Sequence, residues 1–213
     1  MLLIENTVVH GWEAALRGMR NPLNSWAKSD TAYTTVSGVP IIGKNDLSLC
    51  KRLCEAGSEH RKFLRYITVT FDITAPMYWL AQLDTYKVGT VRNSTSKMHK
   101  LLSKPFDMDD FETDELQQEA QGVLQVLIDQ LNNWRERYLK TPQENVIARH
   151  DLWNAVLTLL PESYRQKSTM LVNYEVLRNI YRQRKNHKLG LWHEFCAWIA
   201  ALPYATELLT GGD

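Results

Sequence analysis

A polar stretch over residues 84–97 combines small hydroxyl side chains with a glycine and with lysines toward both ends. Lys87 stands just before Gly89, and Lys97 closes the stretch. The hydroxyl residues between the two lysines are Thr90, Ser94, Thr95 and Ser96. Hydroxyl and backbone N–H groups can satisfy phosphate oxygens, lysine supplies a mobile positive charge, and glycine lets the backbone approach a ligand. The stretch therefore predicts a cradle for an anionic ligand, with a polar turn between two helices as the alternative.

Basic residues also gather over residues 182–188. The cluster comprises Arg182, Arg184, Lys185, His187 and Lys188. It can bind a phosphate, or it can be a solvated helix end whose cations complement the helix dipole. The sequence leaves both interpretations open.

Arg184 lies at helical spacing from earlier residues of an expected helix over 168–185. The residues near one meridian of that helix are Asn173, Leu177, Ile180 and Arg184. We therefore expect Arg184 to project from the buried side, where a guanidinium needs an anionic partner. That partner is either Glu194 on the next helix or a phosphate of a ligand.

Three cysteines in 213 residues argue against a disulfide framework. Cys50 and Cys54 lie four positions apart on one face of an expected helix, which favours buried core thiols over a zinc clip. His193 and Cys196 lack further ligand-type residues at metal-binding spacing, and no cysteine has an adjacent base in sequence. We predict no metal site and no cysteine nucleophile.

The composition is that of an ordinary globular protein, with 44% hydrophobic and 23% charged residues. Its length suffices to bury a core, and we expect a single domain over residues 1–213. The net charge of +1 gives no global field that would attract nucleic acid or an anionic membrane. The first residues carry no signal-peptide pattern, and no apolar run approaches the ~18 residues of a membrane span. We expect a cytoplasmic protein with neither of these partners.

Hydrophobic periodicity and turn residues predict the elements that must position these groups. The expected strands cover residues 2–9, 39–42 and 66–73. The expected helices cover residues 11–19, 46–56, 76–86, 114–139, 142–158, 168–185 and 188–201. Loops are expected over residues 29–45 and 100–112. This pattern predicts an α+β fold that is mostly helical, with a small mixed or antiparallel sheet.

Three of the predicted helices have specific signatures. The residues of one continuous apolar stripe over 114–139 are Leu116, Ala120, Val123, Leu127, Leu131, Trp134 and Tyr138. Pro76 suits the first turn of helix 76–86. Thr141 is expected to cap helix 142–158, with Glu144 closing a capping box.

The middle of the chain also carries motifs in a recognisable order. Glu59 and His60 precede the strand over 66–73, an Ala-Pro pair follows at 75–76, and Gln82 comes after five more residues. This order resembles the flavin-dependent thymidylate synthases (ThyX). In that family the Gln opens a block that reads, three residues on, Arg-His-Arg-x-x-Ser-x-Asn-Glu-x-Ser-x-Arg.

The block matches this chain in part. Thr85, Tyr86 and Lys87 stand at the Arg-His-Arg positions, Arg92 and Asn93 stand at Asn-Glu, and Cys54 stands where the family has a further His. The positions that keep their chemistry are Lys87, Thr90, Thr95 and Lys97. The first Arg, the His and the Glu are replaced, which puts the catalytic part of the resemblance in doubt.

A second patch of resemblance lies near the C-terminus. The family shows an aromatic residue before a Thr, an Asn with an apolar run, an Arg, and a helix carrying a Glu. The matching residues here are Tyr164, Thr169, Asn173, Arg184 and Glu194.

The resemblance implies a ThyX-like fold and methyl transfer to deoxyuridine monophosphate (dUMP). Methylenetetrahydrofolate would give the carbon, and reduced FAD, recharged by NADPH, would give the hydride. It also implies a homotetramer that builds each site from several subunits. The cofactor-binding residues it implies are Glu59, His60, Gln82, Tyr86, Lys87 and Thr90. The substrate-binding residues it implies are Ser94, Thr95, Ser96, Lys97, Asn173 and Arg184.

Three alternatives remain open. The chain can be a nucleotide- or flavin-binding protein that has lost catalysis, an enzyme of the same fold acting on another nucleotide, or a helical scaffold. Loss of the Arg-His-Arg pattern and its Glu favours the first two over the standard reaction.

Overall fold

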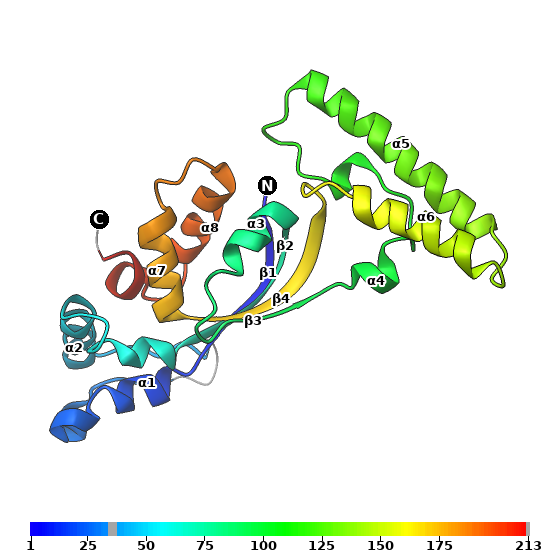
Figure 1. Ribbon diagram of the computed structural model, residues 1–213. Coiled ribbons are helices and arrows are strands. Elements are labelled where there is room, and N and C mark those ends of the chain that lie inside the picture. The colour runs from blue at the N-terminus through cyan, green and yellow to red at the C-terminus, as the bar shows by residue number, and fades with distance from the viewer. Residues whose placement is uncertain (34–37, 212–213) are drawn as a thin grey trace. The chain divides into compact units, whose positions relative to one another are not determined.

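The structure is a computed structural model that describes residues 1–33 and 38–211 (Figure 1). About half of the chain is helical, and four strands form an antiparallel sheet in the order β1-β2-β4-β3. The strands are β1 Leu3–His10, β2 Thr68–Pro76, β3 Val91–Ser94 and β4 Arg165–Asn173. The predicted fold class, mostly helical with a small sheet, is confirmed.

The helices cover most of the positions expected from periodicity. Their bounds are α1 Trp12–Gly18, α2 Lys44–Glu55, α3 Met77–Leu83, α4 Lys97–Lys100, α5 Gln118–Lys140, α6 Val146–Leu159, α7 Tyr174–Arg184 and α8 Gly190–Ala200. Short 3₁₀ turns lie at Asn21–Leu23, Trp26–Lys28, Lys62–Arg65 and Met108–Asp110, and a π turn lies at Thr206–Thr210.

The chain forms two compact units. The α5–α6 unit comprises Met1, Thr74–Leu83 and Ser94–Ser168, and the α7–α8 unit comprises Leu2–Ile73, Asp84–Asn93 and Thr169–Asp213. The chain passes from one unit to the other after Met1, within strands β2, β3 and β4, and between Leu83 and Asp84. The single-domain assignment stays a prediction.

In the α5–α6 unit, the two long helices enclose an apolar core. Leu124, Ile128 and Leu131 of α5 are buried together with Val156 of α6. The predicted stripe on this helix is partly wrong, because Val123 is 69% exposed. The buried face begins one residue later, at Leu124, which lies about 100° further round the helix.

The predicted cap of helix 142–158 is wrong. The Thr141 hydroxyl donates to the Arg137 carbonyl at 2.7 Å and so closes α5. Helix α6 starts at Val146, and its cap is Asn145, whose side-chain oxygen accepts from the Ala148 N–H at 3.3 Å. A turn over 142–145 therefore separates the helices, and a Thr at this place serves the preceding helix equally well.

In the α7–α8 unit, large aromatic side chains fill the core. Trp12 meets Tyr174 and Tyr204 edge-to-face, with ring centroids 5.5 and 5.6 Å apart. Phe71 of β2 and Phe195 of α8 are buried in the same unit. Cys50, Cys54 and Cys196 are buried free thiols, which confirms the core role expected for the first two. Burial raises the pKa of Cys54 and of Cys196 to about 11, so both stay protonated at neutral pH.

Several predicted element bounds are corrected. Residues 168–173 belong to strand β4 and not to a helix, so Asn173 ends a strand and caps α7. Gln166, Ser168, Met170 and Val172 share the buried face of β4, and the two polar residues among them hide the strand in the sequence. Pro76 ends β2 and does not open a helix.

The other corrections concern loops. Strand β3 interrupts the polar stretch over 84–97, so that stretch is not a simple turn between two helices. In the loop predicted over 29–45, Ala32 and Ile41 form an isolated antiparallel bridge in place of a strand. The part of that loop over 34–37 lies outside the described residues.

Candidate functional site

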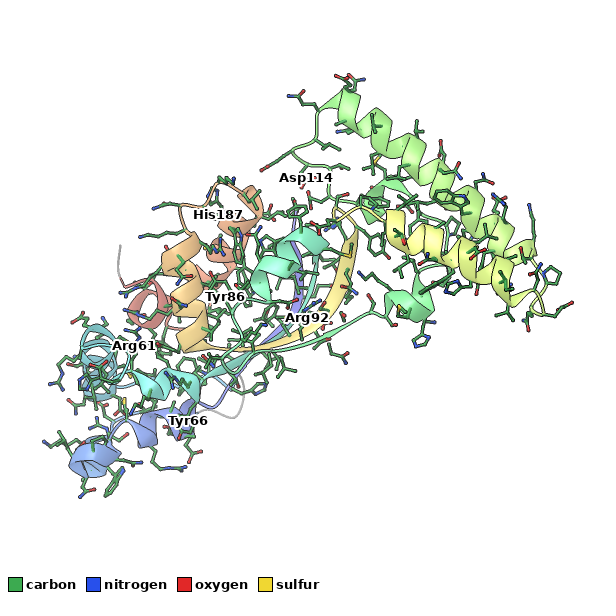
Figure 2. All side chains as sticks on the ribbon, in the orientation of Figure 1. Arg61, Tyr66, Tyr86, Arg92, Asp114 and His187 are labelled. Carbon is green, nitrogen blue, oxygen red and sulfur yellow. The ribbon has the colours of Figure 1, made fainter. Side chains whose placement is uncertain are left out.

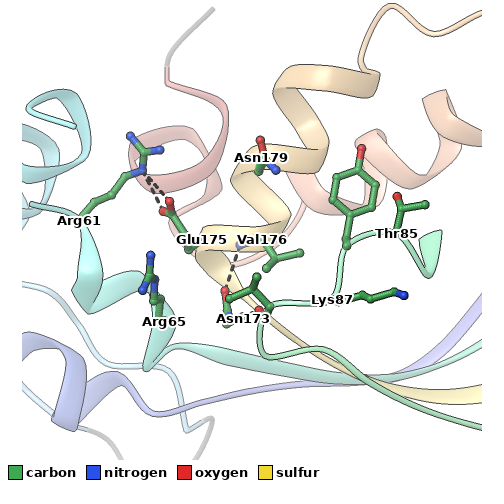
Figure 3. A pocket seen from close by; sticks show the side chains of 10 residues that line it. Arg61, Arg65, Thr85, Lys87, Asn173, Glu175, Val176 and Asn179 are labelled. Atoms are coloured by element: carbon green, nitrogen blue, oxygen red, sulfur yellow. Dashed lines mark hydrogen bonds and ion pairs between the residues drawn. The ribbon is translucent and has the colours of Figure 1, made fainter. Parts of the chain in front are cut away.

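A cavity of about 380 Å³ lies in the α7–α8 unit (Figure 3). Three segments far apart in the sequence form its wall, namely the turn that leads into β2, the loop after α3, and the first turns of α7. The lining residues are Arg61, Arg65, Thr85, Tyr86, Lys87, Val88, Asn173, Glu175, Val176 and Asn179. We call it the α7 cavity; its volume is in the range that small-molecule sites occupy.

The charge of the α7 cavity is positive. Arg61, Arg65 and Lys87 contribute cations, and Glu175 is the carboxylate in the lining. The Nε of Arg61 donates to Oε1 and Oε2 of Glu175 at 3.1 and 2.8 Å, and both side chains are largely buried. The N-terminus of α7, the positive end of its dipole, adds to this field. The cavity therefore suits an anion.

Asn173 connects the loop after α3 to the start of α7. Its Oδ1 accepts from the Val176 N–H at 3.0 Å, and its Nδ2 donates to the Val88 carbonyl at 3.2 Å. Gly89 has φ +75°, and a Cβ there would lie 2.7 Å from Asn173 Nδ2. Asn173, predicted to bind substrate, thus lines the cavity while its amide holds the wall in place.

The loop between α3 and β3 is further closed by an ion pair. Arg92 donates from Nε and Nη2 to the two carboxylate oxygens of Asp84, at 2.9 and 2.6 Å. Thr90 between them has a buried hydroxyl with no hydrogen-bond partner in the part of the chain that the structure describes. A fixed loop geometry keeps Tyr86 and Lys87 at the cavity wall.

Tyr86 joins the α7 cavity to the basic cluster at the end of α7. Arg184 donates its Nε to the Tyr86 hydroxyl at 2.9 Å, and its guanidinium carbon lies 4.7 Å from the Trp192 ring centre. Figure 2 shows Tyr86 on the loop after α3 and Arg61 on the turn that leads into β2. Arg184 is half-buried, and its predicted structural partner Glu194 instead accepts from the Leu2 N–H at 2.6 Å.

A second, smaller cavity of about 160 Å³ lies in the α5–α6 unit. Its lining residues are Thr95, Ser96, Lys97, Lys100, Leu101, Ser103, Lys104, Phe106 and Tyr164. Lys97 contacts the Met77 sulfur at 3.1 Å, and Lys104 pairs with Asp110 at 2.5 Å, which raises the pKa of Lys104. We call it the α4 cavity; three lysines and several hydroxyls give it the chemistry of a phosphate site.

The predicted cradle is thus divided between two cavities. Lys87 lines the α7 cavity, whereas Thr95, Ser96 and Lys97 line the α4 cavity. Thr90 lies in the loop before β3, and Ser94 ends β3. The turn with exposed Glu59 and His60, and Gln82 in α3, contribute to neither lining. The binding roles of all these residues stay predictions.

Among the lining residues of the α7 cavity that sequence reasoning missed, three are charged, namely Arg61, Arg65 and Glu175. Arg61 follows directly after Glu59 and His60, and Arg65 lies four positions further on. This basic pair at helical spacing could have indicated an anion site. The pairing of Arg61 with Glu175, 114 positions away, could not be read from the sequence.

Residues 1–33 and 38–211 hold no group of three His, Cys, Asp or Glu side chains that could bind a metal ion. None of the helices in those ranges combines the length and apolar character needed to span a membrane.

Comparisons with known proteins bear on the fold. No protein-family model and no curated protein sequence matches the chain. Two structures of the Helicobacter pylori flavin-dependent thymidylate synthase ThyX with FAD and dUMP superpose on it with TM-scores of 0.66 and 0.67, at 17% and 18% identity. They cover 97% and 98% of this chain and 98% of each ThyX chain.

A third solved structure extends the comparison. The UMP/dUMP methylase PolB of Streptomyces cacaoi, bound with 5-Br dUMP, superposes with a TM-score of 0.61 at 14% identity over 99% of this chain and 95% of that one. The chain therefore has a ThyX-like fold.

Proposed function

We propose that this protein is a flavin-dependent thymidylate synthase-like enzyme. It would transfer a methyl group to dUMP, with methylenetetrahydrofolate as the carbon donor and NADPH as the source of electrons for FAD. The observation that carries the proposal is the positively charged α7 cavity in a chain with a ThyX-like fold. The neighbours crystallised with FAD and dUMP support it.

The α7 cavity fits the anionic part of a flavin nucleotide. Arg61, Arg65 and Lys87 would hold phosphate oxygens, and Tyr86 offers an aromatic ring at the same wall. A bound reduced FAD would supply the hydride for the reaction. The protein's own contribution at this wall is to orient the bound group through fixed side chains and to shield it from water.

The α4 cavity fits the phosphate of a nucleotide substrate. Thr95, Ser96 and Lys97 line it, and the backbone of Thr95 is fixed because its N–H donates to the Lys167 carbonyl at 2.9 Å. Its carbonyl accepts from Gln166 Nε2 at 2.6 Å. The hydroxyls, the fixed backbone and the lysines of this cavity would position the substrate without themselves reacting.

A second candidate function rests on a specific observation. Thr85 and Tyr86 stand where the resemblance expects Arg and His, and the Tyr86 hydroxyl is bonded to Arg184 and to Gln183. A protein that binds flavin or nucleotide without making thymidylate, or that acts on another nucleotide, fits this change. The fold similarity to a UMP/dUMP methylase supports the latter.

Two measurements test the proposal. We expect purified protein to show the visible absorbance of a bound flavin, or to acquire it with added FAD. We then expect product formation from dUMP with methylenetetrahydrofolate and NADPH, followed by chromatography, with UMP and dCMP as competing substrates. A colourless protein that binds neither FAD nor dUMP in calorimetry would overturn the proposal, and flavin binding without turnover of dUMP would favour the second candidate.

The cellular setting completes the proposal. A cytoplasmic homotetramer whose subunits share sites remains our expectation.

A further inference from the structure

We infer that Arg61, held in place by Glu175, is the anchor for a phosphate group in the α7 cavity. This inference rests on the proposed function and assigns that binding role to a residue outside the motif-like stretch over 84–97.

The first argument is the way Arg61 is bonded. The Nε–H of Arg61 donates to both carboxylate oxygens of Glu175, at 3.1 and 2.8 Å (Figure 3). Within the described ranges, the hydrogen bonds of the Arg61 side chain come from Nε, and its two terminal nitrogens make none. A guanidinium presents its donors as a rigid planar fork, and a carboxylate that holds one corner leaves the remaining donors pre-oriented for an oxyanion.

The second argument is the charge around the cavity. Arg65 and Lys87 line it beside Arg61, and neither forms an ion pair with any described residue. Arg178, 2% exposed on the same helix as Glu175, donates among the described residues to the carbonyls of Leu208 at 2.7 Å and Cys54 at 3.5 Å. In the cavity lining, Glu175 is the carboxylate beside three cations, and an anion in the cavity would offset the excess positive charge of that lining.

The third argument concerns the kind of anion. The chain's net charge of +1 does not favour a long polyanion, whereas a cavity of about 380 Å³ suits one compact phosphate ester. Thr85, where the resemblance expects an arginine, lines the same cavity. Arg61 therefore supplies from the opposite wall segment the kind of charge that position 85 lacks.

The experiment measures Kd for FAD and for dUMP by calorimetry on the full chain. We expect Arg61→Gln to weaken FAD binding at least tenfold, about 1.4 kcal/mol, and to leave dUMP binding unchanged; a loss of dUMP affinity instead would assign Arg61 to the substrate's phosphate. Arg61→Lys should recover part of the lost affinity, because lysine restores the positive charge but not the planar set of guanidinium donors. Glu175→Gln should give a smaller loss, because Arg61 remains but is less well oriented.

A matched control and a competitor separate binding from folding. Arg52→Gln removes an exposed arginine of α2 outside the cavity and should change both Kd values less than twofold. Inorganic phosphate should compete with the affected ligand in wild type and lose this effect in Arg61→Gln. If Arg61→Gln does not fold, the same two measurements, the ligand Kd values and the phosphate competition, are made on Arg61→Lys. Values equal to those of the wild type would contradict the inference.

The outcomes are distinct. Wild-type binding with affinities unchanged in the folded Arg61 variants would overturn this inference and leave the proposed function standing. Wild-type protein that binds neither FAD nor dUMP would overturn both.

Discussion

Arg184 shows how a half-buried guanidinium is stabilised without a carboxylate. The sequence predicts that Arg184 projects from the buried side of its helix and pairs with an anion, either Glu194 or a ligand phosphate. In the structure its Nε donates to the Tyr86 hydroxyl, and its charge lies over the Trp192 ring. The aromatic face and the phenol oxygen together replace the expected carboxylate, because a cation over an aromatic ring gains about 0.5–2 kcal/mol. Arg184 thereby fixes Tyr86 at the cavity wall.

The two lysines of the predicted cradle give a test at the residue scale. We expect Lys87→Ala to weaken FAD binding about threefold to tenfold and to leave dUMP binding unchanged, because Lys87 lines the α7 cavity. Lys97→Ala should do the reverse, because Lys97 lines the α4 cavity. Calorimetry measures both, and the free energy of unfolding should change by about 0.5 kcal/mol or less. Equal losses of the same ligand in both variants would contradict the assignment of one ligand to each cavity.

At the scale of elements, the junction of β4 and α7 positions the α7 cavity. Strand β4 ends at Asn173, and the same residue caps α7 and bonds to the loop after α3. The cavity wall therefore depends on one side chain that joins a strand, a helix and a loop. Gly89 is the residue that allows this close approach.

Gly89→Ala tests this junction. Its φ of +75° is strained for alanine, and the added Cβ would lie 2.7 Å from the Asn173 amide. We expect a loss of about 1–3 kcal/mol in the free energy of unfolding, measured by urea denaturation, and weaker binding in the α7 cavity.

The matched control for this test is Gly122→Ala in α5. An added Cβ at Gly122 meets no atom within 4 Å, and a helical alanine should stabilise the protein by about 0.5–1 kcal/mol. Stability of Gly89→Ala at or above the wild-type value would show that the junction tolerates a side chain.

At the scale of the whole molecule, we expect an oligomer, and the resemblance to the flavin-dependent thymidylate synthases implies a tetramer. Seven tryptophans are many for one core, and aromatic residues are enriched at interfaces, but Trp192 is fully buried in its own core and is not available to a partner. Exposed apolar side chains of the α5–α6 unit now carry the argument: Val123, Val126, Val146 and Ile147 are 68–77% exposed. Val123 and Val126 lie in the first half of α5, and Val146 and Ile147 open α6; we expect at least one of these exposed apolar pairs to contact another copy.

Light scattering at micromolar concentration tests the oligomer. We expect a mass above that of the 24.7 kDa chain, and a Val123→Glu/Val126→Glu variant should lower it. Leu23→Glu, an equally polar change at an exposed residue of the α7–α8 unit, should leave the mass unchanged. A monomeric wild-type protein would contradict the oligomer and the sharing of sites between subunits.

The sequence by itself determined the class of fold and most of the helices. Helix α5 and strand β2 are predictable because their periodic apolar residues report local geometry directly. Motif order also indicated the ThyX-like fold, which the solved structures support.

Only the tertiary structure decided which charges share a cavity. Strand β4 was hidden by buried polar residues such as Gln166, which donates to the Thr95 carbonyl just past β3. The division of the cradle follows from β3, a four-residue strand that exists only by pairing. Arg61 and Glu175 are 114 positions apart, and the pair forms because the turn before β2 meets the first turn of α7. Side-chain pairing over such separations depends on packing of the whole unit, and no local pattern encodes it.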